Sequence, residues 1–212
     1  MSSSHEAPPE QLRHPLEVDP EDWAPSHLYT LVTSLVVPRP VGWISTMSLA
    51  GQLNLAPYSY FNLVADRPPH VMFSSIGVKD TLRNVRETAE FVVNLAGRSE
   101  LSALDVSASS PPVGMSEFEL GGVTVADSLR VRSPRVAEAK AHLECRAVRE
   151  VAAGNGYLVI GRVVHIHVDP SVWADGKVVP ALYDPVVRLS RRYGALGLEV
   201  TPEEEPSDHV LA

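Results

Sequence analysis

The sequence predicts a mainly β protein, an antiparallel barrel that carries a few short helices. Short apolar runs rich in β-branched residues recur along the chain, and about seven of them have the length of strands. Two of the gaps between these runs, residues 49–52 and 153–156, carry the glycine-bearing signal of a hairpin turn. No G-x-G-x-x-G motif follows a strand candidate, which disfavours a parallel sheet built to bind a dinucleotide. Together these observations favour a closed antiparallel architecture.

Composition narrows the class of protein. A length of 212 residues and a hydrophobic content of 44% are typical of one soluble domain with a sizeable core. The formal net charge of −8 argues against a nucleic-acid partner, because proteins that bind nucleic acids present a basic face. The single cysteine, Cys145, excludes an intrachain disulfide, and we expect it to be a small buried side chain in a reducing compartment.

We expect neither export nor a membrane anchor. No apolar run approaches the ~20 residues that a membrane helix needs. The first 25 residues are rich in proline and acidic side chains and lack the apolar core of a signal peptide. The sequence therefore predicts a cytoplasmic protein with no membrane association.

The chain divides into three parts by composition. Residues 1–27 cannot bury an apolar face and are expected to form an N-terminal arm, either disordered or packed on a partner subunit. Residues 28–200 contain all the strand candidates and are expected to form the barrel domain. Residues 201–212 are acidic and are expected to form a disordered tail.

The first strands are predicted from apolar runs that end at prolines and turns. Residues 31–37 form an apolar, β-branched run closed by two prolines, which cannot donate ladder hydrogen bonds. Residues 41–47 predict the next strand, and a tight turn returns the chain through a strand at 53–56. Residues 56–66, rich in aromatic and small polar side chains, predict a loop or a short helix.

A short helix is predicted between two strands, residues 71–76 and 91–95. Apolar residues recur at i, i+3 and i+7 between residues 80 and 89, which places them on one face of a helix. Asp80 is the predicted N-cap, because an aspartate side chain accepts hydrogen bonds from the first free N–H groups of a helix. Thr81 would then be the first helical residue.

The second half of the chain predicts another hairpin. Residues 99–106 are expected to form a short helix, and residues 107–114, rich in serine and proline, a loop. Residues 141–151 and 157–168 predict two long strands joined by the second turn signal.

An ordered set of motifs within residues 28–195 resembles the flavin reductase-like family of FMN-binding split barrels. The resemblance is carried by the order of the motifs and the gaps between them. The motifs are RPVGWIST (39–46), GQLNLAPYSYF (51–61), PP (68–69), SS (74–75), KDT (79–81), Asn84, EFVVN (90–94), EF (117–118), LEC (143–145), GRVVH (161–165) and RLSRRY (188–193).

The resemblance implies a homodimer of antiparallel split β-barrels with FMN in a groove at or near the subunit interface. It also implies reduction of flavin by NADH or NADPH, and some members of the family serve a partner monooxygenase. No nucleophile–base pair or carboxylate dyad stands out in the sequence, which suits chemistry carried by a cofactor. Two alternatives stay open: an FMN-binding electron carrier without nicotinamide activity, and a module for haem or another ligand.

Within this resemblance, Lys79 and Thr81 are predicted to hold the FMN phosphate. The N-terminus of a helix offers unpaired N–H groups and partial positive charge, to which Lys79 adds a full charge and Thr81 a hydroxyl. Asn84, one turn into the helix, would lie close enough to contact the ligand. The competing interpretation is an ordinary capped helix with a solvated lysine.

The isoalloxazine ring is expected to lie against residues 54–59. Its pyrimidine edge alternates donors and acceptors, which the Asn54 amide and the backbone of Ala56, Tyr58 and Ser59 would match. Pro57 would hold this segment rigid. The alternative is a segment whose aromatic side chains simply fill the core.

Hydroxyl groups at strand ends are expected to reach the ribityl chain and phosphate. The alternative is that these hydroxyls bond backbone groups. Trp43 is assigned to the core or, less favoured, to stacking on the ligand. The hydroxyl set is Ser45, Thr46, Ser74 and Ser75.

The C-terminal motif contributes Arg191 and Tyr193, which would close over the flavin or attract a nicotinamide phosphate. Its Ser-Arg-Arg sequence replaces small residues, including glycine, that are common in the family. His165 and His167 share one face of their predicted strand and would suit a metal or haem, or line the groove. No third metal ligand stands at a telling spacing, so we predict no metal site.

Overall fold

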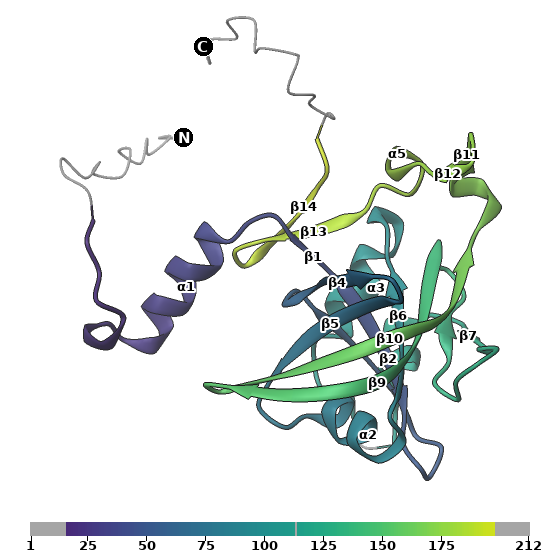
Figure 1. Ribbon diagram of the computed structural model, residues 1–212, viewed down its shortest axis with the longest axis horizontal. Helices are drawn as coiled ribbons and strands as arrows, with labels where there is room; N and C mark the ends of the chain where they lie inside the picture. The colour runs from purple at the N-terminus through teal and green to yellow at the C-terminus, as the bar shows by residue number, and fades with distance from the viewer. Residues whose placement is uncertain (1–15, 113, 198–212) are drawn as a thin grey trace, which may run out of the picture.

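The computed structural model describes residues 16–112 and 114–197, and it shows a mainly β protein (Figure 1). Seven antiparallel strands form one strongly curved sheet in the order β3-β2-β6-β9-β10-β5-β4. These strands are β2 (Gly42–Met47), β3 (Leu53–Tyr58), β4 (Phe61–Asp66), β5 (Pro69–Ile76), β6 (Glu90–Leu95), β9 (Ala141–Ala153) and β10 (Gly156–Val168).

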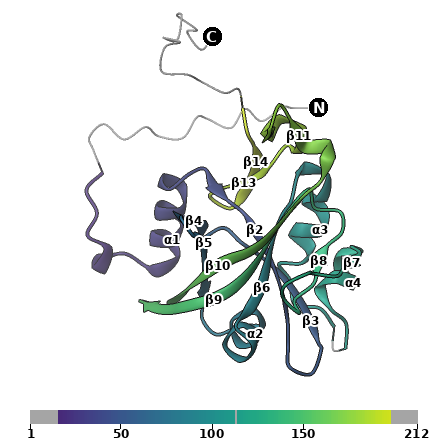
Figure 2. The ribbon, with the colours of Figure 1, turned by 45° about the vertical axis from the view of Figure 1, so that its right-hand side comes forward.

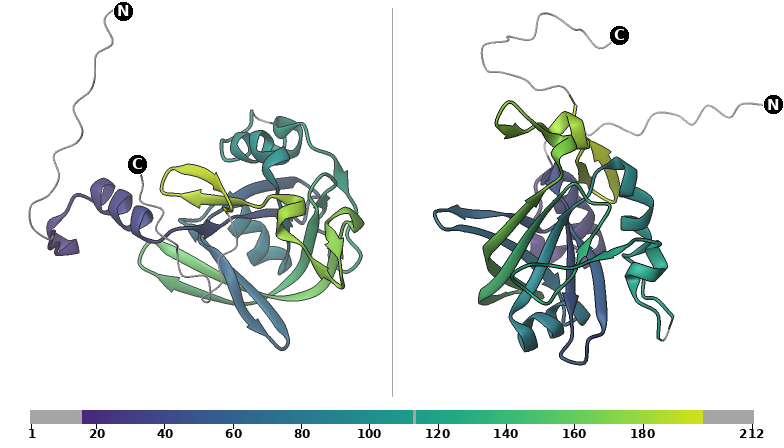
Figure 3. Two further views of the ribbon diagram at one scale, coloured as in Figure 1. Left: turned by 90° about the horizontal axis from the view of Figure 1, so that it is seen from above. Right: turned by 90° about the vertical axis from the view of Figure 1, so that its right-hand side faces the viewer.

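In the described part of the chain, three smaller sheets and five α-helices surround the large sheet (Figure 3). The sheets pair β1 (Arg39–Pro40) with β13 (Val186–Leu189) and β14 (Arg192–Ala195), β7 (Val125–Ala126) with β8 (Arg135–Val136), and β11 (Trp173–Ala174) with β12 (Lys177–Val178). The α-helices are α1 (Pro25–Leu35), α2 (Asp80–Thr88), α3 (Leu101–Val106), α4 (Glu117–Gly121) and α5 (Pro180–Tyr183), and the 3-10 helices are η1 (Pro20–Asp22), η2 (Arg98–Glu100) and η3 (Pro170–Val172).

Two apolar cores lie on opposite faces of β2. Ile44 belongs to the first core with Phe73 and Phe91, while Trp43 belongs to the second core, which packs under α3 and α4. Successive side chains of a strand point to opposite faces, so neighbours in the sequence enter different cores. Because both faces of β2 are covered, its residues are buried on both sides, including the polar Ser45 and Thr46.

The predicted hairpins and central strands are present. The β2–β3 turn contains Gly51 at φ +84°, and the β9–β10 turn contains Gly154 at φ +57°, both in the left-handed region that glycine tolerates. The helix predicted between two strands is α2, and the one predicted at residues 99–106 is η2 followed by α3.

Three predictions about local structure were wrong. Residues 31–37 were expected to be a strand, but they lie largely in α1, which starts with Pro25 at its first position. The helix satisfies its own backbone, so the β-branched run needs no neighbouring strand. Residues 56–66 are not a loop or helix, because they complete β3 and form β4. The N-cap of α2 is Lys79, not Asp80.

The limits predicted for the arm and tail fall partly on residues that the structure does not describe. Residues 1–15 of the predicted arm and all of the predicted tail, 201–212, lie outside the described residues, as do 198–200 at the end of the predicted domain. The described part of the arm, residues 16–27, includes η1 and the start of α1. Within the described ranges, no helix combines the length and apolarity needed to cross a membrane.

Candidate functional site

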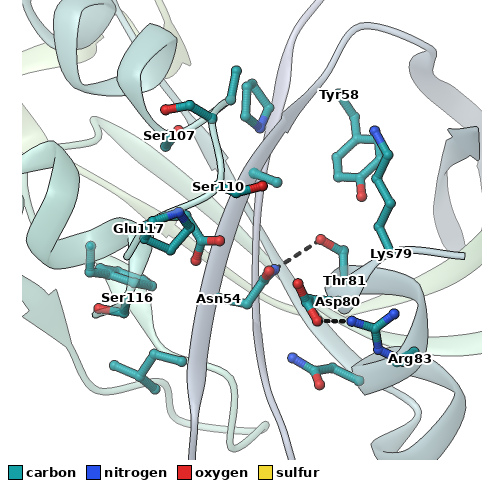
Figure 4. A pocket seen from close by; sticks show the side chains of 18 of the residues that line it. Asn54, Tyr58, Lys79, Asp80, Thr81, Arg83, Ser107, Ser110, Ser116 and Glu117 are labelled. Atoms are coloured by element: carbon teal, nitrogen blue, oxygen red, sulfur yellow. Dashed lines mark hydrogen bonds and ion pairs between the residues drawn. The ribbon is translucent and has the colours of Figure 1, made fainter. Parts of the chain in front are cut away.

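A cavity of about 1120 Å³ opens between β3, the start of α2 and the segment 107–119 (Figure 4). β3 is an edge strand of the large sheet, so one side of the cavity runs along a strand that has a neighbour on one edge only. Residues 107–112 and 114–119 line the cavity beside this edge, and α4 begins at Glu117. Tyr29 from α1 also lines the cavity.

The N-terminus of α2 points its first residues, Lys79, Asp80 and Thr81, at this cavity. Lys79 is the N-cap, and no side chain caps the helix. The Asp80 carboxylate pairs with the Arg83 guanidinium one turn along instead of with the backbone N–H groups. The first N–H groups of an α-helix have no partner inside the helix. This helix end therefore keeps its capacity to bind an anion.

A buried network of hydroxyl and amide groups forms the floor beside this helix end. The Asn54 amide donates from Nδ2 to Thr81 Oγ1 at 2.9 Å and to Thr46 Oγ1 at 3.2 Å. Asn84 Nδ2 donates to the same Thr46 oxygen at 3.0 Å. Since Thr46 is fully buried on β2, the network ties β2, β3 and α2 together and fixes the residues that face the cavity.

The opposite wall carries Glu117, the first residue of α4. Its Oε2 accepts a hydrogen bond from the backbone N–H of Leu55 at 3.1 Å, which satisfies a donor on the open edge of β3. Desolvation raises the pKa of the Glu117 carboxyl, and the backbone hydrogen bonds it accepts only partly offset this. Ser116 caps the helix through a reciprocal pair of bonds with Glu119. These contacts hold the wall against the strand.

Tyr58 lies at the end of β3, close to Lys79 in Figure 4. Burial raises the pKa of its phenol, and hydrogen bonding with the hydroxyls of Thr81 and Ser75 opposes that rise. Its ring packs on Phe73 with centroids 4.8 Å apart. Tyr58 is therefore a neutral, fixed side chain that joins the first core to the cavity.

Most of the predicted cofactor-binding residues line this one cavity, although they come from β3, β5 and α2. The residues predicted to face the isoalloxazine ring and those predicted to hold the phosphate therefore line the same cavity. The residues are Asn54, Ala56, Pro57, Tyr58, Ser59, Ser74, Lys79, Thr81 and Asn84.

Four of the remaining predicted residues are fully buried behind the cavity wall. Thr46 supports the floor, as described. Trp43 fills the second core and donates from Nε1 to Ser107 Oγ at 2.8 Å. Ser45 donates to the carbonyl of Pro134 at 2.5 Å, and Ser75 to the carbonyl of Gly77 at 2.9 Å. The hydroxyls of Ser45 and Ser75 therefore bond backbone carbonyls, as the alternative interpretation of strand-end hydroxyls predicts.

Arg191 and Tyr193 lie on the β13–β14 hairpin, outside the cavity lining. The Arg191 guanidinium stands 5.9 Å from the ring centroid of Tyr29, which does line the cavity. Tyr193 packs on the second core, and Arg188 lies over its ring at 4.2 Å. Arg191 is thus one side chain removed from the cavity.

Several lining residues were not predicted from the sequence. Tyr29 belongs to a segment interpreted as the start of the domain, and no site residue was predicted at 107–119, of which residues 107–114 were predicted to form a loop. The sequence Ser116-x-x-Glu119 is a capping-box signal that predicts the start of α4. No local signal predicts that this segment folds onto β3.

His165 and His167 of β10 are both half-buried, and their ring centroids lie 4.6 Å apart. His167 Nε2 lies 2.5 Å from Oε1 of Glu144, which is fully buried and also accepts three backbone N–H groups from residues 129–131. A register shift between Val163 and His165 alters the alternation, and Ile166 is exposed. Among the described residues, no three His, Cys, Asp or Glu side chains cluster as a metal site.

The chain is similar to known proteins in sequence and in structure. Residues 34–194 match the family model of the flavin reductase like domain. An uncharacterized protein of Aquifex aeolicus (strain VF5) is 38% identical over 172 residues, which cover 78% of this chain and 88% of that protein.

Two solved structures share the fold over nearly the whole chain. Nitrilotriacetate monooxygenase component B from Bacillus cereus superimposes with a TM-score of 0.84 and 33% identity, covering 89% of this chain and 100% of that one. The 2-nitrobenzoate 2-nitroreductase NbaA of Pseudomonas fluorescens superimposes with a TM-score of 0.80 and 25% identity, covering 91% and 100%. The antiparallel split barrel predicted from the sequence is confirmed.

Proposed function

The chain belongs to the family of flavin reductase like domains, and from this premise we propose that it binds FMN and reduces it with NADH or NADPH. The observation that carries the proposal is the uncapped N-terminus of α2, which opens beside Lys79 and Thr81 into a cavity of about 1120 Å³. Bound flavin would supply the redox chemistry, accepting a hydride from the nicotinamide and passing electrons onward.

The helix end fits a phosphate monoester. A phosphate dianion needs several donors and positive potential, which the free N–H groups of α2, the Lys79 ammonium and the Thr81 hydroxyl offer together. Asp80 would repel such an anion, but its carboxylate is paired with Arg83. With Asp80 paired to Arg83, Lys79 is the charged residue at this helix end that forms no ion pair among the described residues.

The strand side of the cavity fits a flat ring with one polar edge. Pro57 and Tyr58 present rigid apolar surfaces, while the Asn54 amide and the Ser59 hydroxyl supply polar groups at the same wall. Leu55 directs its N–H outward to Glu117, so the next residue, Ala56, directs its own backbone groups toward β2. We therefore expect Ala56 to contact the ring through its methyl group.

The cavity is large enough for two planar ligands. Pockets that hold one small molecule commonly measure about 300–1,000 Å³, and this one measures about 1120 Å³. A nicotinamide could lie against the flavin face without leaving the cavity. The role of the protein would be to bind both rings in parallel and to exclude water, since the described lining holds no nucleophile–base pair.

We also propose that the protein works as a homodimer and passes electrons to an oxygenase partner. α1 stands apart from the barrel (Figures 1 and 3). Its apolar side chains Val32 and Leu35 are exposed, as are Leu63 and Val64 on β4. Surfaces of this kind mark protein contacts. The similarity to a protein named monooxygenase component B supports an oxygenase as the acceptor.

The test is a spectroscopic titration of the purified protein with FMN, followed by anaerobic addition of NADH or NADPH. We expect saturable FMN binding and loss of the oxidised flavin absorbance within seconds to minutes of adding the nicotinamide. A protein that binds FMN but leaves it oxidised under both nicotinamides would be an electron carrier. A protein that does not bind FMN would refute the proposal.

A further inference from the structure

Three arginines crowd the short β13–β14 hairpin. Arg188 is the residue before the end of β13, Arg191 lies in the turn, and Arg192 begins β14. None of the three forms an ion pair with a carboxylate in the described ranges 16–112 and 114–197. The chain as a whole carries a net charge of −8, so this is a local concentration of positive charge on an acidic protein. Such a concentration favours an anionic ligand.

A fourth arginine adds to the charge behind the hairpin. Arg39 on β1 stands directly opposite Arg188 in the strand register, and like charges in that position repel each other. The Arg39 side chain is buried and donates to the carbonyls of Thr33 at 2.6 Å and Val36 at 2.7 Å, at the C-terminal end of α1. It contacts carbonyls and no carboxylate, so its full charge still adds to the potential at the hairpin.

The tip of the hairpin adjoins the rim of the cavity. Arg39 Nη2 donates to the carbonyl of Ser190 at 3.0 Å, and its Nε lies 3.5 Å from Oγ of Ser59, a lining residue. Arg191 lies over the ring of Tyr29, which is also in the lining. Figure 2 shows the hairpin between α1 and α3, above the large sheet. The arginines therefore form a second cationic region, separate from Lys79.

We propose that Arg191 and Arg192 bind the 2′-phosphate of NADPH and make the protein select NADPH over NADH. This inference rests on the proposed function. The two nicotinamides differ only in that phosphate, whose dianion matches the donor fork of a guanidinium. Both arginines are exposed and have no acidic partner among the described residues, and an arginine is a common partner of this phosphate. Arg188, held on Tyr193, adds positive charge beside them.

The experiment compares ligands that differ by one phosphate. Isothermal titration measures the Kd of 2′,5′-ADP and of 5′-AMP for the full chain and for an Arg191→Ala, Arg192→Ala double variant. We expect the double variant to lose about tenfold or more in affinity for 2′,5′-ADP, as loss of charge-assisted hydrogen bonds implies. Steady-state kinetics should show a similar rise in KM for NADPH and a change below about twofold for NADH.

A matched control is Arg162→Ala, which removes an exposed arginine of β10 that also lacks an ion pair among the described residues. It should leave both ligand affinities unchanged. Thermal melting and the Kd for FMN show whether the double variant is folded. A wild-type protein that binds 2′,5′-ADP no better than 5′-AMP would overturn the inference. So would a variant that loses affinity for FAD, because the arginines would then serve the adenylyl phosphate of that flavin.

Failure of the inference can be told apart from failure of the proposed function. Titration with 2′,5′-ADP needs neither flavin nor turnover. A protein that reduces FMN with both nicotinamides but ignores the extra phosphate refutes the hairpin assignment alone. A protein that binds 2′,5′-ADP through the arginines but does not bind FMN refutes the proposed function alone.

Discussion

Lys79 occupies the N-cap position of α2 but its side chain does not cap the helix. A capping side chain would consume the N–H groups that an anion needs, so an uncapped start is a cost in helix stability that a ligand can offset. Thr81 is constrained in another way, because its hydroxyl accepts the Asn54 amide at 2.9 Å. Lys79 is therefore the residue that can be changed with the least damage to the surrounding structure.

We predict that Lys79→Ala weakens FMN binding by about tenfold, because it removes one charge-assisted contact to the phosphate. Riboflavin, which lacks the phosphate, should bind the variant and the wild type equally. Fluorescence quenching of the two flavins measures both affinities. The exposed Arg162 of β10 provides a matched control, since Arg162→Ala removes a cation that pairs in register with His70, at the end of β5 away from α2. Equal losses for FMN and riboflavin would contradict a phosphate contact.

His142 gives the protein a predictable response to acid. Burial is the main reason that the pKa of its imidazole falls from 6.5 to about 4, with further lowering by Arg135 and His167. Its Nε2 bonds the carbonyl of Val136 at 2.7 Å, while its Nδ1 is buried without a hydrogen-bond partner in the described structure. The folded protein therefore holds this ring neutral at a pH where the unfolded chain protonates it.

The free energy of unfolding should therefore fall as the pH drops from 6.5 toward 4. The unfolded state binds more protons than the native state in that window, so stability increases with pH there. The contribution of His142 is about 3 kcal/mol across the whole window. Urea unfolding of the wild type and of His142→Gln at several pH values should show a flatter dependence in the variant. The pKa of the Glu144 carboxyl is lowered, so protonation of Glu144 below its usual pKa also decreases the free energy of unfolding as the pH falls. Glu144 is present in both proteins, so its effect cancels in the comparison. If the free energy of unfolding changes with pH equally in both proteins, His142 is not the source of the pH dependence.

At the level of elements, periodicity predicted the long strands and α2 because each buries a regular stripe of side chains. β5, β6, β9 and β10 lie where apolar runs predicted them, and their ends differ by a few residues. α1 was predicted wrongly, since its β-branched residues are typical of a strand. The helix stands off the barrel and leaves Val32 and Leu35 exposed, so burial does not decide its conformation. Hydrogen bonds within the helix and Pro25 at its first position determine the helical conformation.

One contact between elements explains why β10 contains Gly161. A Cβ at this position would lie 2.3 Å from Cζ of Phe91 and 2.5 Å from Cε1 of the same ring. We predict that Gly161→Ala lowers the free energy of unfolding by about 1–3 kcal/mol through overpacking. Chemical denaturation measures this. Adding Phe91→Leu should recover part of the loss, and Gly197→Ala, where a Cβ meets nothing within 4 Å, should cost little. A stable Gly161→Ala variant would show that the ring can move aside.

At the scale of the whole molecule, the residues predicted from the sequence line one side of the cavity, along β3 and the start of α2. Lys79 and Thr81 could be predicted as anion-binding residues because a charge and a hydroxyl at the start of a helix form a local sequence pattern. The 107–119 wall and Tyr29 could not, because they reach the cavity only through long-range packing. Glu117 lines the cavity because its carboxylate accepts the N–H of Leu55 on the edge strand β3. That β3 is an edge strand follows only from the order of strands in the sheet, which no local sequence pattern gives.

The position of α1 joins the proposed dimer to the proposed site. Leu35 is 72% exposed on this helix, while Tyr29 of the same helix lines the cavity. If a second copy covers the exposed face, dimerisation would hold Tyr29, and the hairpin arginine beside it, at the rim. We predict that Leu35→Glu shifts the protein from dimer to monomer, because it places a charge in the covered face. Sedimentation velocity measures the change.

The monomeric variant should also bind NADPH several-fold more weakly, about fivefold or more, because Tyr29 and Arg191 lose their fixed position. FMN phosphate binding at α2 should change less, since the contacts of that helix are made within one chain to β2 and β3. Leu129→Glu, which places the same charge at a residue that is 69% exposed between β7 and β8, serves as the control and should stay dimeric. A Leu35→Glu protein that remains a dimer, or a wild type that is monomeric, would show that α1 is not the dimer contact.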